Sequence, residues 1–241
     1  MSAAGTAAPA LELAGLTVAH GSTVVVRGVS LTVPQGAVVA LLGANGAGKT
    51  TLMRAAAGLL RASRGTVRLD GRDVTARPAD LRSRAGLCHV PEGRGIFRGL
   101  TVRENLQLQV PKARAAEAVT EAVEFFPQLR EKLKVQAGTL SGGQQQMLAL
   151  AAGHLRRPTV LLVDEPSLGL APLVVDEIFE FLARRAAAGT AILIVDQFVD
   201  RTLAIADTAH VLRRGEIVHS APADELDQAE VFDHYAGTDR R

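Results

Sequence analysis

The stretch that decides the fold is Gly43-Ala44-Asn45-Gly46-Ala47-Gly48-Lys49-Thr50, directly after the apolar run Ala37-Val38-Val39-Ala40-Leu41-Leu42. The octapeptide from Gly43 to Thr50 matches the pattern G-x-x-x-x-G-K-[ST]. The apolar run is typical of a strand that is buried on both faces of a parallel sheet, and helical periodicity extends from Thr50 to Leu60. The pattern therefore lies between a predicted strand and a predicted helix, the setting that a phosphate-binding loop requires.

The glycines of this loop allow the backbone to curl so that successive N–H groups converge on phosphate oxygens. The helix that begins near Lys49 adds the positive end of its dipole. We expect Lys49 to neutralise the β- and γ-phosphates of a nucleotide and Thr50 to bind Mg²⁺. The residues predicted to bind the nucleotide here are Gly43, Ala44, Asn45, Gly46, Ala47, Gly48, Lys49, Thr50 and Thr51.

Two acidic residues, Asp164 and Glu165, follow a second apolar run at residues 160–163. Phosphoryl transfer needs a further magnesium contact and a group that orients water. We expect Asp164 to contact Mg²⁺ through its water shell and Glu165 to act as general base or to position the water. Alone, such a pair is more typical of a helix cap or a solvated turn, but the phosphate loop upstream favours the catalytic interpretation.

A third element, Leu140-Ser141-Gly142-Gly143-Gln144, precedes a predicted helix at residues 142–155. Ser141 and Gln144 have the spacing of a capping box, which orders the first turn of a helix. The N–H groups of such a turn attract anions. By itself this pentapeptide is equally consistent with a well-capped helix and with half of an anion site.

The rest of the chain predicts an α/β fold with a mostly parallel sheet, because strand and helix patterns alternate after residue 158. Residues 11–33 predict antiparallel strands, residues 66–74 a small hairpin, and residues 210–220 a closing hairpin. Residues 113–126, 129–133 and 142–155 predict helices of an inserted lobe. We expect a single domain over residues 1–241, with a core at about 8–91 and 158–220, a helical subdomain at about 92–157, and a charged, weakly packed tail at 221–241.

Composition excludes several functions. The 241 residues include 27 Lys and Arg against 25 Asp and Glu, a balance that argues against a nucleic-acid-binding domain. Seven Phe, one Tyr and no Trp leave too few aromatic rings for a base-stacking surface. The single Cys88 cannot form an intrachain disulfide, and no apolar run approaches the roughly 20 residues of a membrane-spanning helix. We expect a cytoplasmic protein that acts at a membrane only through partners.

The order and spacing of the phosphate loop, the Leu140–Gln144 element and Asp164-Glu165-Pro166-Ser167 resemble the ATP-binding subunit of ABC transporters. The resemblance implies a P-loop NTPase core of the ABC ATPase type that binds ATP and Mg²⁺. It also implies a head-to-tail dimer, homomeric or heteromeric, in which the second subunit completes each ATP site. The residues that would do so are Ser141, Gly142, Gly143 and Gln144.

The same resemblance implies further roles and partners. By position, His20 replaces the aromatic residue that stacks on adenine, and Glu92 replaces a Gln that senses the γ-phosphate, from where a carboxylate can reach magnesium. Gln197 replaces the switch histidine, so it can donate a hydrogen bond to the γ-phosphate but cannot shuttle a proton; with Glu165 it forms the expected catalytic pair. The implied partners are transmembrane permease subunits and, indirectly, a solute-binding protein, at the cytoplasmic face of the inner or plasma membrane.

Gln197, Pro91-Glu92-Gly93-Arg94 and residues 167–172 look like the branched-chain amino acid importer branch of that family. Ala171, where the family customarily has Asp, is ordinary in this branch, whereas Ala152 and Phe198 replace its usual Arg and Asn. The implied function is ATP hydrolysis that powers import of branched-chain amino acids. The alternatives are import of urea or short amides, a soluble ABC ATPase acting on DNA or ribosomes, and a non-hydrolysing regulatory partner.

Overall fold

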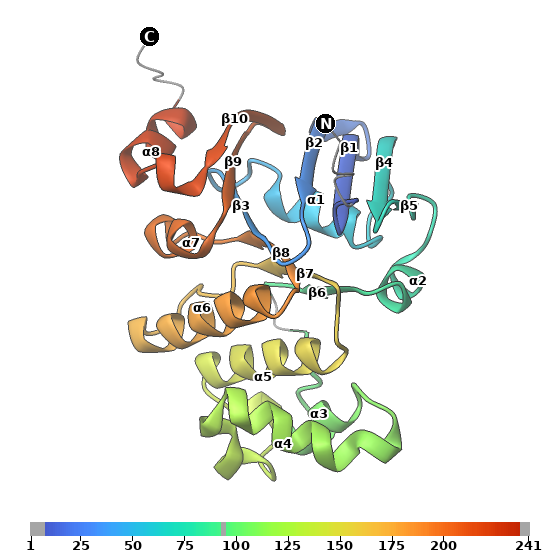
Figure 1. The fold of residues 1–241 in the computed structure, drawn as a ribbon, viewed down its shortest axis with the longest axis vertical. Helices are drawn as coiled ribbons and strands as arrows, with labels where there is room; N and C mark the ends of the chain where they lie inside the picture. Colours follow the sequence, from blue (N-terminus) through green and yellow to red (C-terminus); the bar gives the residue numbers. More distant parts are fainter. Residues whose placement is uncertain (1–7, 93–94, 237–241) are drawn as a thin grey trace, which may run out of the picture.

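Two β-sheets organise the core of the molecule (Figure 1). The structure is a computed structural model that describes residues 8–92 and 95–236. The smaller sheet is antiparallel, in the order β2-β1-β4-β5. Its strands are β1 (Leu11–His20), β2 (Thr23–Val33), β4 (Arg64–Leu69) and β5 (Arg72–Asp73). Asp70 and Gly71 both have positive φ, at 47° and 74°, which is the geometry of the tight hairpin predicted there.

The larger sheet has the order β10-β9-β3-β8-β7-β6. Its neighbouring strands run parallel except for β10, which is antiparallel to β9, and this confirms the predicted mostly parallel sheet and closing hairpin. Every residue of β3, β7 and β8 is buried. The strands are β3 (Val38–Leu42), β6 (Leu87–Val90), β7 (Val160–Asp164), β8 (Ala191–Val195), β9 (Thr208–Arg213) and β10 (Glu216–Pro222).

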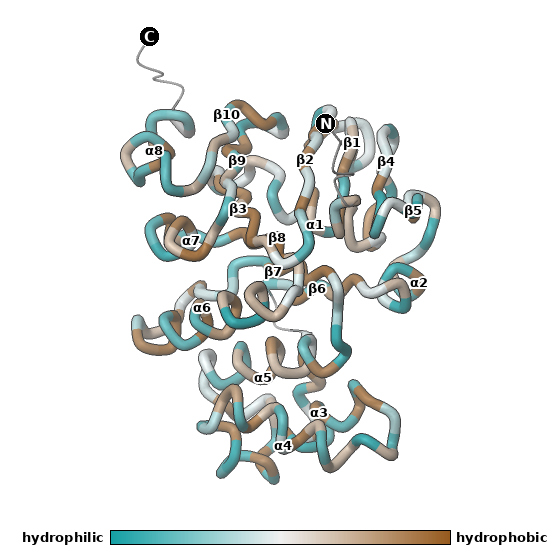
Figure 2. Tube along the Cα trace, in the orientation of Figure 1, coloured by the Kyte–Doolittle hydropathy of each residue, from teal (hydrophilic) through white to brown (hydrophobic). Residues whose placement is uncertain are grey.

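The large sheet separates two hydrophobic cores. Alternate residues of β3 enter different cores: Val39 and Leu41 pack with the small sheet and helix α1, whereas Val38, Ala40 and Leu42 pack on the opposite face. This burial on both faces is why the central strands are continuous apolar runs. Figure 2 shows the resulting concentration of hydrophobic residues along the central strands. The core helices are α1 (Lys49–Ala56), α2 (Ala79–Arg84), α6 (Pro172–Ala187), α7 (Val199–Ile205) and α8 (Gln228–Ala236).

Between β6 and β7 the chain forms the helices α3 (Val102–Gln107), α4 (Ala115–Phe125) and α5 (Gly142–Leu155), which together are called the helical lobe below. In Figure 1, α5 lies between α6 on one side and α3 and α4 on the other, which explains why ten of its fourteen residues are buried. The short 3₁₀ helices of the chain are η1 (Lys112–Arg114), η2 (Pro127–Lys132), η3 (Ala137–Thr139) and η4 (Ala223–Glu225).

Several predicted boundaries are wrong for local physical reasons. The helix expected over residues 50–60 ends at Ala56, and Gly58 has φ 79°, a conformation that ends helices. The expected helix at residues 129–133 is the 3₁₀ helix η2, which begins at Pro127. Helices α2 and α3 have no counterpart in the prediction, because six residues are too few to show helical periodicity. Strand β6 has none either, because His89 interrupts its apolar residues.

The C-terminal tail was expected to pack weakly, and the described part of it does not. Strand β10 continues to Pro222, and α8 packs against β9, with Val231 fully buried. The rings of His219 and His234 stack at a centroid distance of 4.2 Å. The buried apolar side chains Ala223 and Val231 thus help to attach this charged segment to the core.

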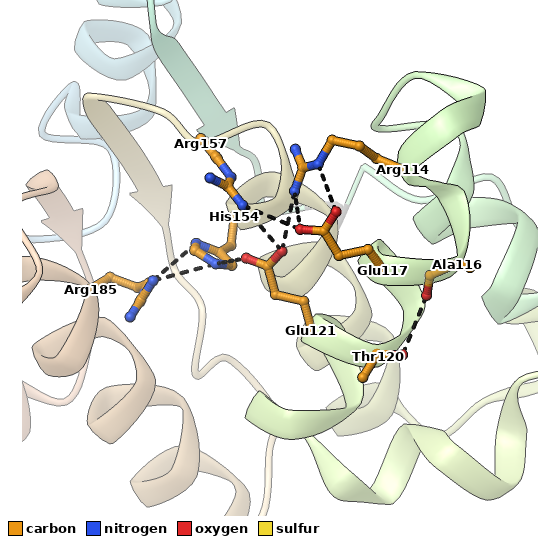
Figure 3. A network of polar contacts seen from close by, with 8 residues as sticks. All are labelled: Arg114, Ala116, Glu117, Thr120, Glu121, His154, Arg157 and Arg185. Carbon is orange, nitrogen blue, oxygen red and sulfur yellow. Dashed lines mark hydrogen bonds and ion pairs between the residues drawn. The ribbon is translucent and has the colours of Figure 1, made fainter.

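A polar network attaches the helical lobe to the core (Figure 3). Glu121 of α4 accepts a hydrogen bond from His154 of α5 at 2.9 Å, and the Arg185 guanidinium of α6 lies 3.4 Å from the same imidazole. Arg114 and Arg157 also pair with Glu121. Burial and the charge of Arg185 lower the pKa of His154, while Glu121 acts in the opposite direction. The network thus joins three helices that belong to two parts of the molecule.

Within residues 8–92 and 95–236, none of the helices combines the length and apolarity that crossing a bilayer demands.

Candidate active site

The phosphate loop connects β3 to α1 and has the conformation that its glycines permit. Gly46 and Gly48 have φ values of 80° and 110°, a region that favours glycine. A Cβ atom at Gly43 would lie 2.4 Å from the backbone oxygen of Leu212, so no larger residue fits. Gly48 is the N-cap of α1 and offers no side-chain cap. The first N–H groups of α1 are therefore available to an anion in the loop.

Lys49 lies inside the curl of this loop. It is only 5% exposed, and its Nζ donates hydrogen bonds to the backbone oxygens of Gly43 at 2.7 Å and Ala44 at 3.1 Å. Burial lowers the pKa of Lys49, against the opposing effect of the Glu165 and Asp164 carboxylates. The ammonium is thus desolvated and held among oxygen acceptors, where phosphate oxygens would be stronger partners than carbonyls.

Thr50, in the first turn of α1, is hydrogen-bonded to Asp164, the last residue of β7. The Thr50 Oγ1 hydroxyl donates to Asp164 Oδ1 at 3.3 Å. Asp164 is 1% exposed, and its Oδ2 is buried with no hydrogen-bond partner. Burial raises the pKa of Asp164 to about 6; the Glu165 and Glu92 carboxylates also raise it, while the Thr50 hydroxyl and Lys49 lower it. A buried carboxylate oxygen without a hydrogen-bond donor is energetically costly, and a cation bound to that oxygen would compensate for the missing donor.

The oxygen atoms of Thr50 and Asp164 are suitable ligands for Mg²⁺. A hydroxyl and carboxylate oxygens are the hard ligands that Mg²⁺ prefers, and it is usually held by one or two carboxylates together with substrate phosphates. Accordingly, the described residues contain no cluster of three or more His, Cys, Asp or Glu side chains that could hold a metal ion by themselves. Thr50 and Asp164, with Glu92 at the adjoining cavity, are the residues that would hold the ion.

Glu165 and Gln197 follow neighbouring strands, β7 and β8, and their side chains touch. Gln197 Nε2 donates to Glu165 Oε2 at 3.1 Å. Glu165 has φ 47°, a left-handed conformation that is uncommon for a residue with a Cβ atom, and its N–H donates to the oxygen of Val195 at 2.8 Å. The strained backbone turns the carboxylate away from the strand and toward the amide of Gln197.

One cavity of about 560 Å³ is lined by half of the predicted site residues, nine of eighteen. Lys49, Thr50, Thr51, Glu92, Glu165 and Gln197 line it together with Asn45, Gly46 and Gly48. Val25 and Leu168 also line it and were not predicted, because an apolar residue of a strand or loop carries no chemical signal in the sequence. Their place at the cavity follows only from the packing of β2 and of the loop after β7 beside the phosphate loop.

Of the other predicted residues, Gly43, Ala44 and Ala47 belong to the phosphate loop and Asp164 is bonded to Thr50, but none of them lines this cavity. His20 is exposed at the end of β1 and does not line this cavity, and neither do the residues of the Leu140–Gln144 element. The predicted capping box is confirmed: Ser141 Oγ accepts from the Gln144 N–H at 3.3 Å, and Gln144 Oε1 accepts from the Ser141 N–H at 3.2 Å. Gly93 and Arg94, which the importer resemblance includes, lie outside the described residues.

Comparison with known proteins decides the family. The model of the family described as "ABC transporter" matches residues 26–168, which is more than half of the chain. The chain belongs to the ABC transporter family. Its phosphate loop, Asp164 and Glu165 all lie within the matched residues, so the family membership and the cavity concern the same part of the molecule. Together they identify this ABC family member as an ATPase.

Relatives of this ABC protein share nearly its whole length. The branched-chain amino acid transport protein BraG of Pseudomonas aeruginosa is 39% identical, over 90% of this chain and 95% of BraG. The probable branched-chain amino acid transport protein LivF of Archaeoglobus fulgidus is 36% identical, over 85% and 89%. A solved ATP-binding subunit of an ABC transporter superposes with a TM-score of 0.82 at 25% identity, over 94% and 99%. The predicted fold class, an ABC ATPase core, is confirmed.

Proposed function

We propose that this protein is the ATP-hydrolysing subunit of an ABC importer for branched-chain amino acids. The observation that carries the hydrolytic part is a cavity lined by Lys49, Thr50, Glu165 and Gln197. Asp164 is hydrogen-bonded to Thr50 at this cavity. The similarity to BraG and LivF over almost the whole chain supports the choice of solute.

The residues at this cavity have different roles in ATP hydrolysis. The N–H groups of the loop and the ammonium of Lys49 bind the triphosphate, and Thr50, Asp164 and Glu92 hold Mg²⁺. When bound, Mg²⁺ neutralises charge on the phosphate oxygens. Glu165 accepts the proton of the attacking water, and Gln197 holds the Glu165 carboxylate at 3.1 Å while it donates toward the γ-phosphate. Gln197 has no group that can accept a proton at neutral pH.

We propose that a second subunit completes the site, because neither His20 nor the Leu140–Gln144 element lines the cavity of its own chain. The ordered first turn of α5 offers the N–H groups of Gly142 and Gly143, and Ser141 and Gln144 keep that turn in place. We propose that this turn covers the triphosphate bound to the other subunit, and that His20 stacks on the adenine. Two nucleotides would then join two subunits, and hydrolysis would release them.

An ATP-binding subunit of this family works with membrane permease subunits. We place the protein at the cytoplasmic face of the membrane, bound to those permeases, with a solute-binding protein as an indirect partner. The division into a core at about residues 8–91 and 158–220 and a helical subdomain at about 92–157 follows the same proposal. Closure of the two subunits favours one orientation of the permeases and opening favours the other.

The test is solute-stimulated ATPase activity in liposomes. The protein is copurified with its permease partners, reconstituted, and assayed with the solute-binding protein and leucine, isoleucine or valine. We expect these amino acids to stimulate hydrolysis, and the Glu165→Gln complex to show no stimulation. Stimulation by urea or acetamide alone would replace the solute assignment, and a complex that does not hydrolyse ATP at all would indicate a regulatory subunit.

A further inference from the structure

One buried carboxylate, that of Asp196, joins the loop that carries Glu165 to the loop that carries Gln197, and Asp196 itself directly precedes Gln197. This residue directly follows β8 and is 3% exposed. Its Oδ2 accepts the N–H of Ser167 at 3.1 Å, and its Oδ1 accepts the hydroxyl of Ser167 at 2.5 Å and the N–H of Phe198 at 2.8 Å. Ser167 is two residues beyond Glu165, and Phe198 is the residue after Gln197.

These three donors are the partners that the described residues offer to the carboxylate, since no ion pair with a described cation involves Asp196. A buried carboxylate must be hydrogen-bonded, and bonds to a charged acceptor are about twice as strong as neutral ones. If the loop after β7 moves away from the loop after β8, the carboxylate loses both donors of Ser167, which water cannot replace in the interior. Asp196 therefore fixes the distance between the two loops.

The conformation of Glu165 shows what this connection holds in place. A left-handed residue with a Cβ atom persists only where its surroundings determine it. The Glu165 N–H is bonded to Val195, and the Glu165 backbone oxygen accepts from the Leu168 N–H at 3.4 Å. The attachment of Ser167 to Asp196 completes the turn between those two bonds. On the other loop, Phe198 is tied back to Asp196, and this sets the position from which Gln197 reaches Glu165.

We propose that Asp196 is a positioning residue for ATP hydrolysis, which acts through Glu165 and Gln197 without contacting the nucleotide. It does not line the cavity, whereas both residues that it positions do. This inference rests on the proposed function, because it assigns Asp196 a part in the same reaction.

The main variant is Asp196→Asn. The amide oxygen can still accept from the Ser167 hydroxyl and Phe198, but the amide NH₂ then faces the N–H of Ser167, where donor meets donor. We expect kcat for ATP hydrolysis to fall about 10- to 100-fold, because a displacement of catalytic groups by about 1 Å can lower a rate by up to about 100-fold. The KM for ATP should change less than about threefold, because the phosphate loop is untouched.

The matched control is Asp207→Asn. The Asp207 carboxylate also accepts a backbone N–H, that of Val38 at 2.8 Å, but at the opposite end of β3 from the phosphate loop. This variant should lower the melting temperature without changing kcat. If Asp196→Asn does not fold, Ser167→Ala provides the second test: it removes only the hydroxyl donor and should lower kcat less, again with little change in KM.

A double-variant cycle separates positioning from general loss of structure. If Asp196 acts through the general base, single-turnover hydrolysis by Asp196→Asn/Glu165→Gln is as slow as by Glu165→Gln alone. The inference would be overturned if the rate losses of the two single variants multiplied in the double variant. It would also be overturned if both Asp196→Asn and Ser167→Ala kept the parent kcat, or if they raised KM at constant kcat. A parent protein without ATPase activity would instead overturn the proposed function, and Glu165→Gln at the parent rate would refute the general base.

Discussion

Replacement of Lys49 by Ala tests the phosphate loop directly. In the structure, Lys49 Nζ already donates to two carbonyl oxygens, at 2.7 and 3.1 Å, and a bound triphosphate would exchange these neutral acceptors for charged ones. Hydrogen bonds between charged partners contribute about 1.5–3 kcal/mol each, against about 1 kcal/mol for each carbonyl bond that is given up. Two such exchanges leave about 3 kcal/mol, which corresponds to a roughly hundredfold weaker Kd for ATP.

Isothermal titration calorimetry with MgATP and with a non-hydrolysable analogue measures this loss. The control is Lys134→Ala, because Lys134 is exposed and lies in the helical lobe, and it should bind ATP as the parent does. The melting temperature of Lys49→Ala should stay close to that of the parent, since the removed ammonium is desolvated by burial. A folded Lys49→Ala protein whose Kd lies within about threefold of the parent value would refute the assigned role.

Three further outcomes are expected. Glu165→Gln should lower kcat by about 10²-fold or more while it keeps nucleotide binding, so an ATP-bound dimer accumulates in gel filtration; a monomer with parental turnover contradicts this. Burial and Arg54 lower the pKa of His89 to about 4, so stability is complete above the unfolded pKa of about 6.5 and is lost as pH falls toward 4. Urea unfolding at pH 7 and 5 should therefore differ by about 2 kcal/mol more in the parent than in His89→Phe, and equal differences would refute the argument. Phe126→Ala should cost about 3–5 kcal/mol in urea unfolding, because Phe126 is 1% exposed against Phe181, and a loss below about 1 kcal/mol would show that the packing is wrong.

The elements that could be predicted from the sequence are those whose pattern is complete within one segment. Strands β3, β7 and β8 are continuous apolar runs because both of their faces are buried, and α5 begins at the residue that its capping box indicates. Helix α3 also has a capping box, between Thr101 and Glu104, but six residues are too few to show helical periodicity. The tail was misjudged because its packing depends on isolated apolar residues such as Val231.

The same distinction applies to the site. The phosphate loop and the Asp164-Glu165 pair are contiguous in sequence, and their residue types carry the chemistry. Val25 and Asp196 gain their places only from the order of the strands, which the sequence pattern does not specify. Asp196 in particular is an ordinary acidic residue after a strand until the structure shows that its carboxylate accepts three hydrogen bonds.

The order of the strands also explains why hydrolysis and nucleotide binding can share one small space. Strand β8 separates β3 from β7, so the phosphate loop and Asp164 start about 9–10 Å apart, two strand spacings. Asp164 lies in register with Val195, the last residue of β8, and the Thr50 hydroxyl reaches Asp164 past that end. A longer β8 would fill the gap with backbone. Strand β8 ends at Val195, and the carboxylate of Asp196 then binds Ser167 of the loop after β7 and Phe198 of its own loop. Gln197 can therefore line the cavity where a further residue of the strand would otherwise lie.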